Sequence, residues 1–302
     1  MKFMNFSRKT APAVVRVGTI FGKTCFDVTK AIEEDLLEFP RAVFTIEDVL
    51  QVKDGLQILE GQLKGLQQSS SGIQSYLFDP SDIILRPPIT HPAKLIGIGL
   101  NYKDHIAETK TATPKEPLLF AMYSNAITGP DQPIILPQMS GQVDYEAELG
   151  VVIGRRARNV TVETAVEYVA GYTIVNDVSA RDLQFSDGQW LRAKSFDTFA
   201  PLGPYLVTRE TLRDGDGLAI ELRLNGKTMQ KSNTSNMLFK VPDIVSHISK
   251  AMTLEIGDVI ATGTPGGVGF TRNPQVFMKA GDVVEIEIEG IGILRNSVAD
   301  FD

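Results

Sequence analysis

Short apolar or alternating segments, bounded by Gly, Pro, Asn or Asp, dominate the chain beyond residue 94 and predict β-strands. The predicted strands are Leu95–Leu100, Leu118–Ser124, Val143–Ile153, Tyr172–Asp177, Pro204–Thr208, Leu218–Leu224, Asp258–Thr262 and Val283–Glu289. Asn225-Gly226 lies between two alternating runs and is typical of a tight hairpin turn. The predicted helices are Asn101–Thr109, Thr161–Ala170 and Pro242–Met252. Because strands predominate without regular strand–helix alternation, the pattern disfavours a doubly wound parallel sheet.

The part of the chain before residue 94 has a different pattern. An apolar run at Val14–Ile20 is followed by helical periodicity at Ala31–Glu38 and Ile46–Leu66. Turn signals that contain proline indicate a boundary between residues 73 and 93. We therefore predict a small N-terminal α+β region at residues 1–76 and a larger domain at residues 77–302.

Composition narrows the function classes. The 302 residues carry a net charge of −7 without a basic block, which argues against nucleic acid as a partner. Neither a signal-peptide apolar core nor a stretch long enough to cross a membrane is present, so we expect no membrane association. The single cysteine, Cys25, cannot form an intrachain disulfide, which fits a cytoplasmic location. Only three histidines are present, so carboxylates must carry much of any polar chemistry.

Three acidic residues alternate along one predicted strand. Asp144, Glu146 and Glu148 would share one face of an extended strand, which is usually a solvated face. The strand, however, continues into an apolar run, and carboxylates near a core repel one another unless a cation neutralises them. Asp177 ends another apolar strand and offers a third oxygen ligand beside Glu146 and Glu148. Spacing alone leaves two readings open: a solvated face, or a site for Mg²⁺, Mn²⁺ or Ca²⁺.

Three other segments carry candidate chemistry. His105 and Glu108 are neighbours on a helix, either as a surface pair or as a base and the group that orients it. Lys194 lies in an apolar neighbourhood, where the sequence alone favours a side chain that extends to the surface. Residues 263–269 form either a glycine-rich turn or a loop whose N–H groups, with the Thr264 hydroxyl, receive a carboxylate. The polar segment 110–117 has the character of a mobile lid.

Five motifs in a fixed order closely resemble the fumarylacetoacetate hydrolase superfamily. They are residues 99–108 (GLNYKDHIAE), 144–149 (DYEAEL), 176–184 (NDVSARDLQ), 193–198 (AKSFDT) and 262–269 (TGTPGGVG). The resemblance implies an α+β, predominantly β, fold: a mixed β-sandwich roll with a small N-terminal domain. It also implies a homodimer and a Mg²⁺ or Mn²⁺ ion. The implied site residues are Glu146, Glu148 and Asp177 for the metal, His105, Glu108 and Lys194 for catalysis, and Gln184, Gly263 and Thr264 for the substrate.

The same resemblance implies an enzyme that acts on small 2-oxo acids through a metal-stabilised enolate. We expect hydrolysis of the C–C bond of a 2,4-dioxo acid such as fumarylacetoacetate, an acylpyruvate or fumarylpyruvate. Leu100 stands where many small members carry Arg or Lys, which suits a less acidic substrate. The alternative is decarboxylation or tautomerisation of a 2-oxo diacid, such as oxaloacetate or a 2-hydroxyhepta-2,4-dienedioate, at the same site. A Schiff base on Lys194 and a metabolite-binding protein without turnover are further alternatives.

Overall fold

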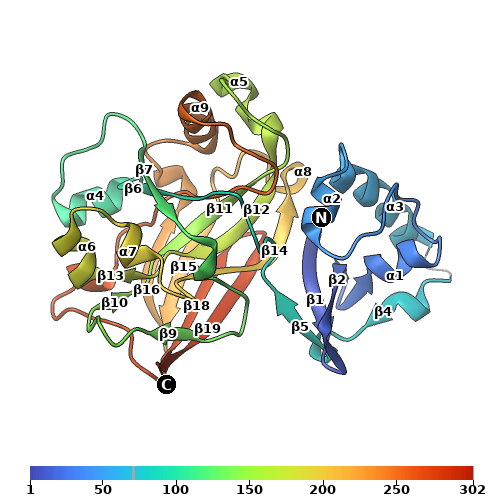
Figure 1. Ribbon diagram of the computed structural model, residues 1–302, viewed down its shortest axis with the longest axis horizontal. Helices are drawn as coiled ribbons and strands as arrows, with labels where there is room; N and C mark the ends of the chain where they lie inside the picture. The colour runs from blue at the N-terminus through green and yellow to red at the C-terminus, as the bar shows by residue number, and fades with distance from the viewer. Residues whose placement is uncertain (70–71, 302) are drawn as a thin grey trace.

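One mixed sheet of 12 strands runs through both lobes of the molecule, for which a computed structural model describes residues 1–69 and 72–301 (Figure 1). Its strands are β1 (Lys2–Arg8), β2 (Ala11–Phe21), β3 (Thr24–Asp27), β4 (Leu77–Phe78), β5 (Ile83–Arg86), β6 (Leu95–Gly99), β7 (Leu118–Met122), β8 (Ile127–Thr128), β11 (Ala147–Ile153), β12 (Val169–Asn176), β14 (Ala200–Thr208) and β17 (Val259–Ala261). The main path is β4-β3-β2-β1-β14-β12-β11-β17-β6-β7, with β5 beside β1 and β8 beside β14. Strands β11 and β12 are buried along their whole length, which agrees with the mostly apolar sequence of the strands predicted there.

A second sheet packs against the first, with β15 against β11, β18 against β12 and β19 against β14. Its order is β16 (Lys227–Asn233), β15 (Ala219–Leu224), β18 (Val283–Ile288), β19 (Gly292–Asp300) and β9 (Ile134–Leu136). A two-stranded ribbon joins β10 (Val143–Asp144) to β13 (Ser179–Ala180). The hairpin predicted at Asn225-Gly226 is confirmed, since both residues have positive φ (53° and 76°) between β15 and β16.

Helices are short and lie outside the sheets. The α-helices are α1 (Val28–Glu33), α2 (Ile46–Leu50), α3 (Gly55–Ser69), α4 (Lys103–Thr109), α5 (Val162–Ala165), α6 (Arg181–Asp187), α7 (Leu191–Lys194), α8 (Arg209–Leu212) and α9 (Val241–Ala251). The 3₁₀ turns are η1 (Gln74–Tyr76), η2 (Pro80–Asp82), η3 (Ser124–Ala126), η4 (Val166–Tyr168), η5 (Thr234–Asn236) and η6 (Gly269–Thr271). Of the helices in the described ranges, none is long and apolar enough to cross a membrane. An α+β, predominantly β, fold is thus confirmed, whereas the sandwich roll stays a prediction.

Several predicted helices differ from the observed ones. The helix predicted over Ala31–Glu38 is α1, which begins and ends earlier, at Val28 and Glu33. The helix predicted over Ile46–Leu66 is divided into α2 and α3, with Asp54 at a positive φ of 58° between them. The helix predicted over Thr161–Ala170 is wrong at its last two residues, because α5 and the 3₁₀ turn η4 end at Tyr168 and β12 begins at Val169. The partner strand β11 decides this boundary, because Val169 pairs with Ile153. Local periodicity does not report such a partner.

The N-terminal lobe is joined to the larger lobe through β1, which pairs with β2 along one edge and with β14 and then β5 along the other. The buried Asn5 amide donates to the carbonyls of Pro87 and Pro88, both at 3.1 Å, and accepts from the Ile46 N–H at 2.8 Å. β4 and β5, residues 77–86, pair with β3 and β1, although they follow the boundary predicted at 76/77. That domain boundary stays a prediction.

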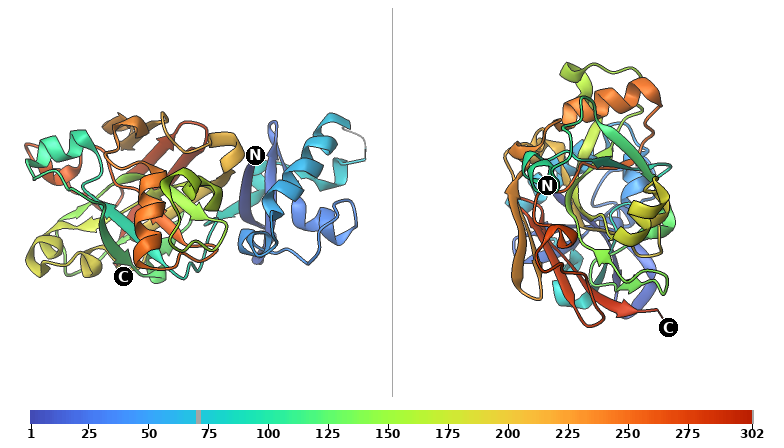
Figure 2. Two further views of the ribbon diagram at one scale, coloured as in Figure 1. Left: turned by 90° about the horizontal axis from the view of Figure 1, so that it is seen from above. Right: turned by 90° about the vertical axis from the view of Figure 1, so that its left-hand side faces the viewer.

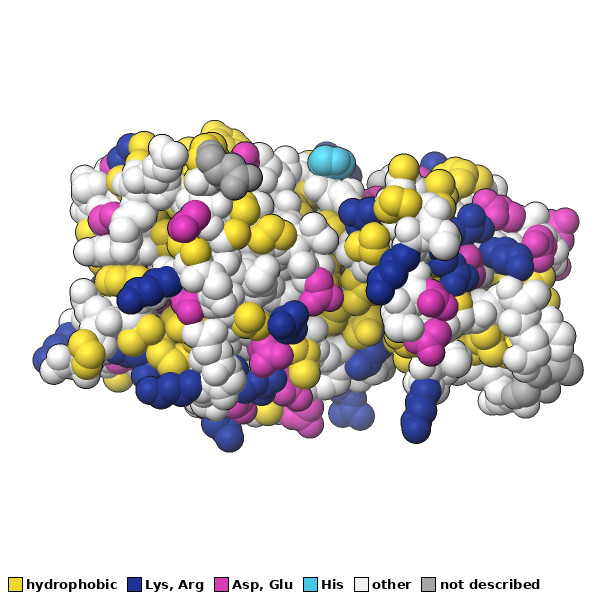
Figure 3. Space-filling model, turned by 90° about the horizontal axis from the view of Figure 1, so that it is seen from below, with side chains coloured by type: hydrophobic (Ala, Val, Ile, Leu, Met, Phe, Trp, Pro, Cys, Tyr) yellow, Lys and Arg dark blue, Asp and Glu magenta, His cyan; other side chains and the backbone are white. Residues whose placement is uncertain are grey.

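The two lobes lie side by side along the longest axis (Figures 1 and 2). The N-terminal lobe lies at the opposite end from α4, α6 and α7 in both figures. On the face drawn in Figure 3, the coloured basic and acidic side chains are interspersed over both lobes. This face of the described residues therefore carries no large patch of one charge.

Candidate active site

A cavity of about 220 Å³ lies where β6, β7 and β11 meet α4, α6 and α7. Six residues predicted for the site line it: His105, Glu146, Glu148, Gln184, Lys194 and Thr264. An apolar wall faces them, made of Leu100, Phe120, Phe185, Trp190 and Phe270. A mostly apolar wall with a few convergent polar groups is the usual form of a small-molecule site.

Strand register brings the three carboxylates together. Glu146, Glu148 and Asp177 each offer an oxygen ligand, and these atoms lie within 4.8 Å of one another. In the antiparallel pair of β11 and β12, Ala147 lies opposite Asn176, so Glu146 and Asp177 are adjacent at its end. The Asp177 N–H donates to the Glu146 carbonyl at 3.0 Å, which closes the pair.

The predicted strand Val143–Ile153 is interrupted, which changes the role of its first acid. β10 ends at Asp144 and β11 begins at Ala147, because β10 pairs with β13 and β11 with β12. Asp144 accepts from the Arg181 guanidinium at 2.9 Å and from the Gly269 N–H at 2.8 Å. Asp144 thus fixes Arg181.

Two cations are buried against these acids. The Lys194 ammonium lies 2.6 Å from Oδ2 of Asp177 and 2.9 Å from Oε2 of Glu146, and its residue is 1% exposed. The extension of Lys194 to the surface, which the local sequence favours, is therefore wrong. Arg181 pairs with Oε1 of Glu146 at 2.7 Å, as well as with Asp144. Four buried carboxylates thus face two buried cations, so two negative charges are left uncompensated.

The pKa values of the three acids reflect this imbalance. Burial raises the pKa of Glu148 well above its ordinary value, and the Asp177 and Glu146 carboxylates raise it further. Burial raises the pKa of Asp177 to about 7, against the opposing effect of Lys194. Burial also disfavours the ionised form of Glu146, but Lys194 and Arg181 outweigh it and lower the pKa of Glu146 to about 2. A positive charge placed among these acids would be strongly stabilised.

The acidic cluster fits a divalent cation. Its donors are all carboxylate oxygens, the set that Mg²⁺ and Mn²⁺ prefer. Oδ1 of Asp177 is buried, and none of the described residues forms a hydrogen bond with it. A buried oxygen without a partner is costly unless a cation binds it, and an ion of charge +2 would balance the two uncompensated charges.

His105 and Glu108 form the pair that their spacing predicts. Nδ1 of His105 lies 2.8 Å from Oε1 of Glu108 on α4. Oε2 of Glu108 accepts from the Gly267 N–H at 2.8 Å and from the Thr271 hydroxyl at 3.2 Å, so both carboxylate oxygens are held. Because Nδ1 is engaged, Nε2 is the ring nitrogen available for proton transfer.

The helix that carries His105 starts later than its sequence predicts. The prediction begins at Asn101, whereas α4 begins at Lys103 with Tyr102 as its N-cap. The Asn101 amide instead donates to the carbonyls of Phe239 and Thr262, at 3.0 and 2.7 Å, and accepts from the Phe239 N–H at 2.8 Å. Asn101 therefore ties the start of α4 to the end of β17. Its role is structural support for the helix that carries His105.

The glycine-rich segment has two separate roles. Gly263, at a φ of 100°, donates its N–H to Oε2 of Glu148 at 2.7 Å, so it positions an acid of the cluster. Thr264 lines the cavity and accepts a hydrogen bond from Gln230 at 2.8 Å. Gln184 also lines the cavity, and its Oε1 accepts from Nη1 of Arg181 at 2.8 Å.

Sequence reasoning gave no separate role to three residues of this site. Asp144 was one of the alternating acids of motif 144–149, and Arg181 lies in motif 176–184, so these motifs were the available signal. Gln230 lies in none of the five motifs. Its local sequence carries no signal for the complete burial of its side chain on β16.

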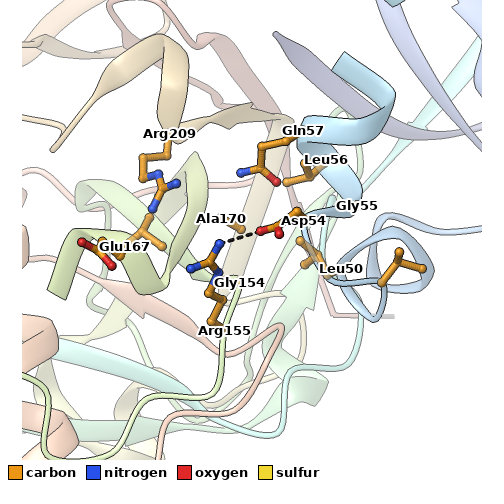
Figure 4. Close-up of a pocket in the computed structure, with 12 residues that line it drawn as sticks. Leu50, Asp54, Gly55, Leu56, Gln57, Gly154, Arg155, Glu167, Ala170 and Arg209 are labelled. Atoms are coloured by element: carbon orange, nitrogen blue, oxygen red, sulfur yellow. Dashed lines mark hydrogen bonds and ion pairs between the residues drawn. The ribbon is translucent and has the colours of Figure 1, made fainter. Parts of the chain in front are cut away.

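A second, smaller hollow lies between the lobes. It holds about 30 Å³ and is lined by residues of α3, β12 and their neighbours. Figure 4 shows Arg155 of the large lobe reaching Asp54 of the N-terminal lobe, an ion pair of 2.5 Å. The hollow has room for about two or three waters. It is a seam between the lobes, too small for an organic acid.

Comparisons with known proteins identify the family. The model of the family described as "Fumarylacetoacetate (FAA) hydrolase C-terminal" matches residues 94–299. The chain is 56% identical over 216 residues to an uncharacterised protein of Archaeoglobus fulgidus, covering 72% of this chain and 82% of that protein. It is 46% identical over 246 residues to the mitochondrial oxaloacetate tautomerase fahd2 of Xenopus laevis, covering 80% of this chain and 77% of that protein.

Solved structures of similar fold have several activities in their names. A fumarylacetoacetate hydrolase of Exiguobacterium antarcticum matches with a TM-score of 0.81 and 35% identity over 100% of both chains. A 2-hydroxyhepta-2,4-diene-1,7-dioate isomerase of Mycobacterium marinum matches with a TM-score of 0.74 and 33% identity over 99% of this chain and 98% of that chain. A maleylpyruvate hydrolase of Sphingobium sp. SYK-6, in complex with manganese (II) ion and pyruvate, matches with 0.78 and 26% over 100% of both chains.

Proposed function

The chain belongs to the fumarylacetoacetate hydrolase family and is an enzyme of that superfamily, and from this premise we propose that it is a divalent-metal-dependent tautomerase of a 2-oxo diacid of the oxaloacetate class. The observation that carries the proposal is the cavity itself. Its lining places the His105 imidazole, held by Glu108, in the same enclosed space as Glu146 and Glu148 of the acidic cluster. A proton-transfer group and a charge-stabilising site thus face one small ligand.

Each residue has a defined part in the proposed reaction. Glu146, Glu148 and Asp177 would hold Mg²⁺ or Mn²⁺, and the pyruvate complex of the manganese-containing maleylpyruvate hydrolase supports this role. When bound, such an ion supplies positive charge that favours ionisation next to a 2-oxo group. Lys194, buried beside Glu146 and Asp177, adds a fixed positive charge at the same end of the cavity.

Tautomerisation moves one proton, and His105 is the group placed to move it. In the keto-to-enol direction the imidazole removes a proton from C3 of the 2-oxo acid and delivers that proton to the C2 oxygen. In the reverse direction it takes the proton from the C2 oxygen and returns it to C3. Glu108 holds the ring through Nδ1 and leaves Nε2 toward the substrate. Thr264 and Gln184 bind the ligand's oxygens. No attacking water is required.

The names of the relatives support one order of the two candidate reactions. The sequence favoured C–C hydrolysis because Leu100 offers no charge to a second carboxylate. The similarity to the Xenopus laevis oxaloacetate tautomerase covers most of both chains and supports tautomerisation first. Hydrolysis of a 2,4-dioxo acid is the second candidate. The Exiguobacterium antarcticum hydrolase favours it, and the His105–Glu108 pair would equally activate a water.

A direct comparison of substrates tests the proposal. Chelator-treated protein, reloaded with Mn²⁺, is mixed with freshly dissolved enol-oxaloacetate, and the loss of its ultraviolet absorbance is followed beside the uncatalysed rate. We expect acceleration that disappears with chelator and in His105→Gln. Acetylpyruvate and maleylpyruvate are tested for release of pyruvate. Rapid pyruvate release with no effect on enol-oxaloacetate would overturn tautomerisation in favour of hydrolysis.

We also propose that the protein is a homodimer. A surface hollow of about 730 Å³ is lined by apolar side chains that include Ile135, Met139, Phe196 and Phe301. Of these residues, Met139 is 57% exposed and Phe301 is 59% exposed. Exposed apolar side chains around one hollow are typical of a protein interface. Light scattering after gel filtration tests this. A monomeric mass at micromolar concentration would contradict it.

A cytoplasmic location remains our expectation, while the Xenopus laevis relative is named mitochondrial.

A further inference from the structure

Gln230 links the acidic cluster to the glycine-rich segment. It lies on β16, the edge strand of the second sheet, and its side chain is completely buried. Its Oε1 accepts from the Ala147 N–H at 2.9 Å, between the two glutamates of the cluster. Its Nε2 donates to the Thr264 hydroxyl and to the Pro265 carbonyl, both at 2.8 Å. One amide thus spans two segments of the site.

The orientation of this amide is fixed by its neighbours. A backbone N–H can only donate, so the atom facing Ala147 must be the amide oxygen. A carbonyl can only accept, so the atom facing Pro265 must be the amide nitrogen. The contact with Thr264 involves that same nitrogen, which therefore donates to the hydroxyl oxygen.

This contact restricts where the Thr264 hydrogen points. A hydroxyl has one hydrogen to donate, and its oxygen here already accepts from Gln230. The bond from Gln230 is the one hydrogen bond of this hydroxyl among the described residues. Thr264 lines the cavity, so its hydrogen is free for an acceptor inside the cavity. The ligand's carboxylate is such an acceptor.

We propose that Gln230 is a positioning residue that orients the Thr264 hydroxyl to donate to the C1 carboxylate of the bound 2-oxo acid. The inference rests on the proposed function, in which Thr264 binds that carboxylate. Gln230 touches no substrate in this account. It acts through Thr264, by occupying one acceptor position of the hydroxyl and leaving its hydrogen for an oxygen acceptor of the ligand.

Binding of oxalate to the Mn²⁺-loaded protein tests the inference. Oxalate has a carboxylate and an adjacent oxygen but undergoes no turnover, so calorimetry reports the contact without catalysis. The variants are Gln230→Met, Thr264→Val and the double variant. Each single variant is expected to weaken oxalate binding by about tenfold, the usual effect of losing a hydrogen bond to a charged group. The double variant should be no weaker than Thr264→Val alone.

Three outcomes would overturn the inference: wild-type protein that binds no oxalate, a Gln230→Met variant that binds it normally, or single effects that multiply in the double variant. Gln230→Leu is the substitute if Gln230→Met folds poorly. Mn²⁺ affinity is measured for each variant, and oxalate is titrated at saturating Mn²⁺, because Gln230 also holds Ala147. If the wild type fails to tautomerise oxaloacetate, the oxalate cycle still decides the role of Gln230.

Two controls separate positioning from general stability. Thr264→Ser keeps the hydroxyl. In a protein that retains Gln230, it should restore oxalate affinity to within about twofold of wild type, in contrast to Thr264→Val. Ser246 lies on α9, away from the cavity lining, and its hydroxyl donates to the Val160 carbonyl at 2.9 Å. Ser246→Ala removes this buried hydrogen bond. It should lower the melting temperature and leave oxalate affinity unchanged. A parallel loss of oxalate affinity in Ser246→Ala would show that stability alone explains the effect.

Discussion

Replacing Lys194 by methionine removes one of the two cations that face the buried acids. The Lys194 ammonium contacts Asp177 at 2.6 Å and Glu146 at 2.9 Å, and the side chain is 2% exposed. Methionine has a similar length and no charge, so the packing is largely kept. The number of uncompensated negative charges among the four carboxylates rises from two to three. The metal-free protein should therefore be less stable, and the bound metal should restore more of its stability.

The size of the effect follows from burial. Removing one partner of a buried ion pair costs about 3–5 kcal/mol, because the other partner is left charged and unsolvated. Unfolding entropy is about 2.1 cal/mol/K per residue, or about 0.6 kcal/mol/K for 302 residues. The melting temperature of metal-free Lys194→Met should therefore fall by about 5–8 °C at pH 8. At saturating Mn²⁺ the difference from wild type should shrink.

Differential scanning calorimetry of chelator-treated and Mn²⁺-loaded protein measures both effects. Lys231→Met is the matched control, since that lysine side chain on β16 is 77% exposed and lies 3.9 Å from its acidic partner. Its melting temperature should stay close to that of wild type. A metal-free Lys194→Met variant as stable as wild type, or a difference that Mn²⁺ leaves unchanged, would refute the charge balance described for this site.

Other predictions concern the base, the pH and the support of α4. His105→Gln should lower kcat by about 10²–10⁴-fold in the enol-oxaloacetate assay while Mn²⁺ affinity, measured by calorimetry, stays near wild type. Because burial raises the pKa of Asp177 from 3.8 to about 7, the folded chain binds this proton more tightly than the unfolded chain. The metal-free protein should therefore lose stability as the pH rises from about 4 to about 7, and a melting temperature that climbs through this window would contradict that shift. Asn101→Ala leaves backbone groups of Phe239 and Thr262 without partners and should destabilise the fold by about 3 kcal/mol in urea unfolding; an unchanged midpoint would mean that water replaces the amide.

Local sequence patterns predicted the elements whose surroundings are reflected in residue type. The mostly apolar runs of β11 and β12 indicate strands covered on both faces, and Asn225-Gly226 identifies a hairpin without any tertiary information. The interruption between Asp144 and Ala147 could not be predicted in this way. It arises because two different partner strands pair with the two ends of one polar–apolar stretch.

In the site, too, contacts between neighbours in sequence were predictable and contacts set by strand pairing were not. The i,i+3 spacing of His105 and Glu108 is a helical property, and the contact was predictable. The burial of Lys194 was not, because its partners lie 17 and 48 residues away and meet only through the register of β11 and β12. The resemblance to the family implied a site role for Lys194, whereas its apolar sequence neighbours favoured a side chain that extends to the surface. Gln230 has contacts 34 and 83 residues away and lies outside every motif.

A titration of chelator-treated protein with Mn²⁺, followed by calorimetry, tests the central claim most directly. We predict one ion bound per chain, binding that is retained in His105→Gln, and binding that is lost in Glu148→Gln, which keeps the size of a cluster ligand but removes its charge. Stronger binding at pH 8 than at pH 5 should accompany it, since Glu148 and Asp177 must lose their protons. Wild-type protein that binds no Mn²⁺, or a Glu148→Gln variant that binds it as wild type does, would contradict the account.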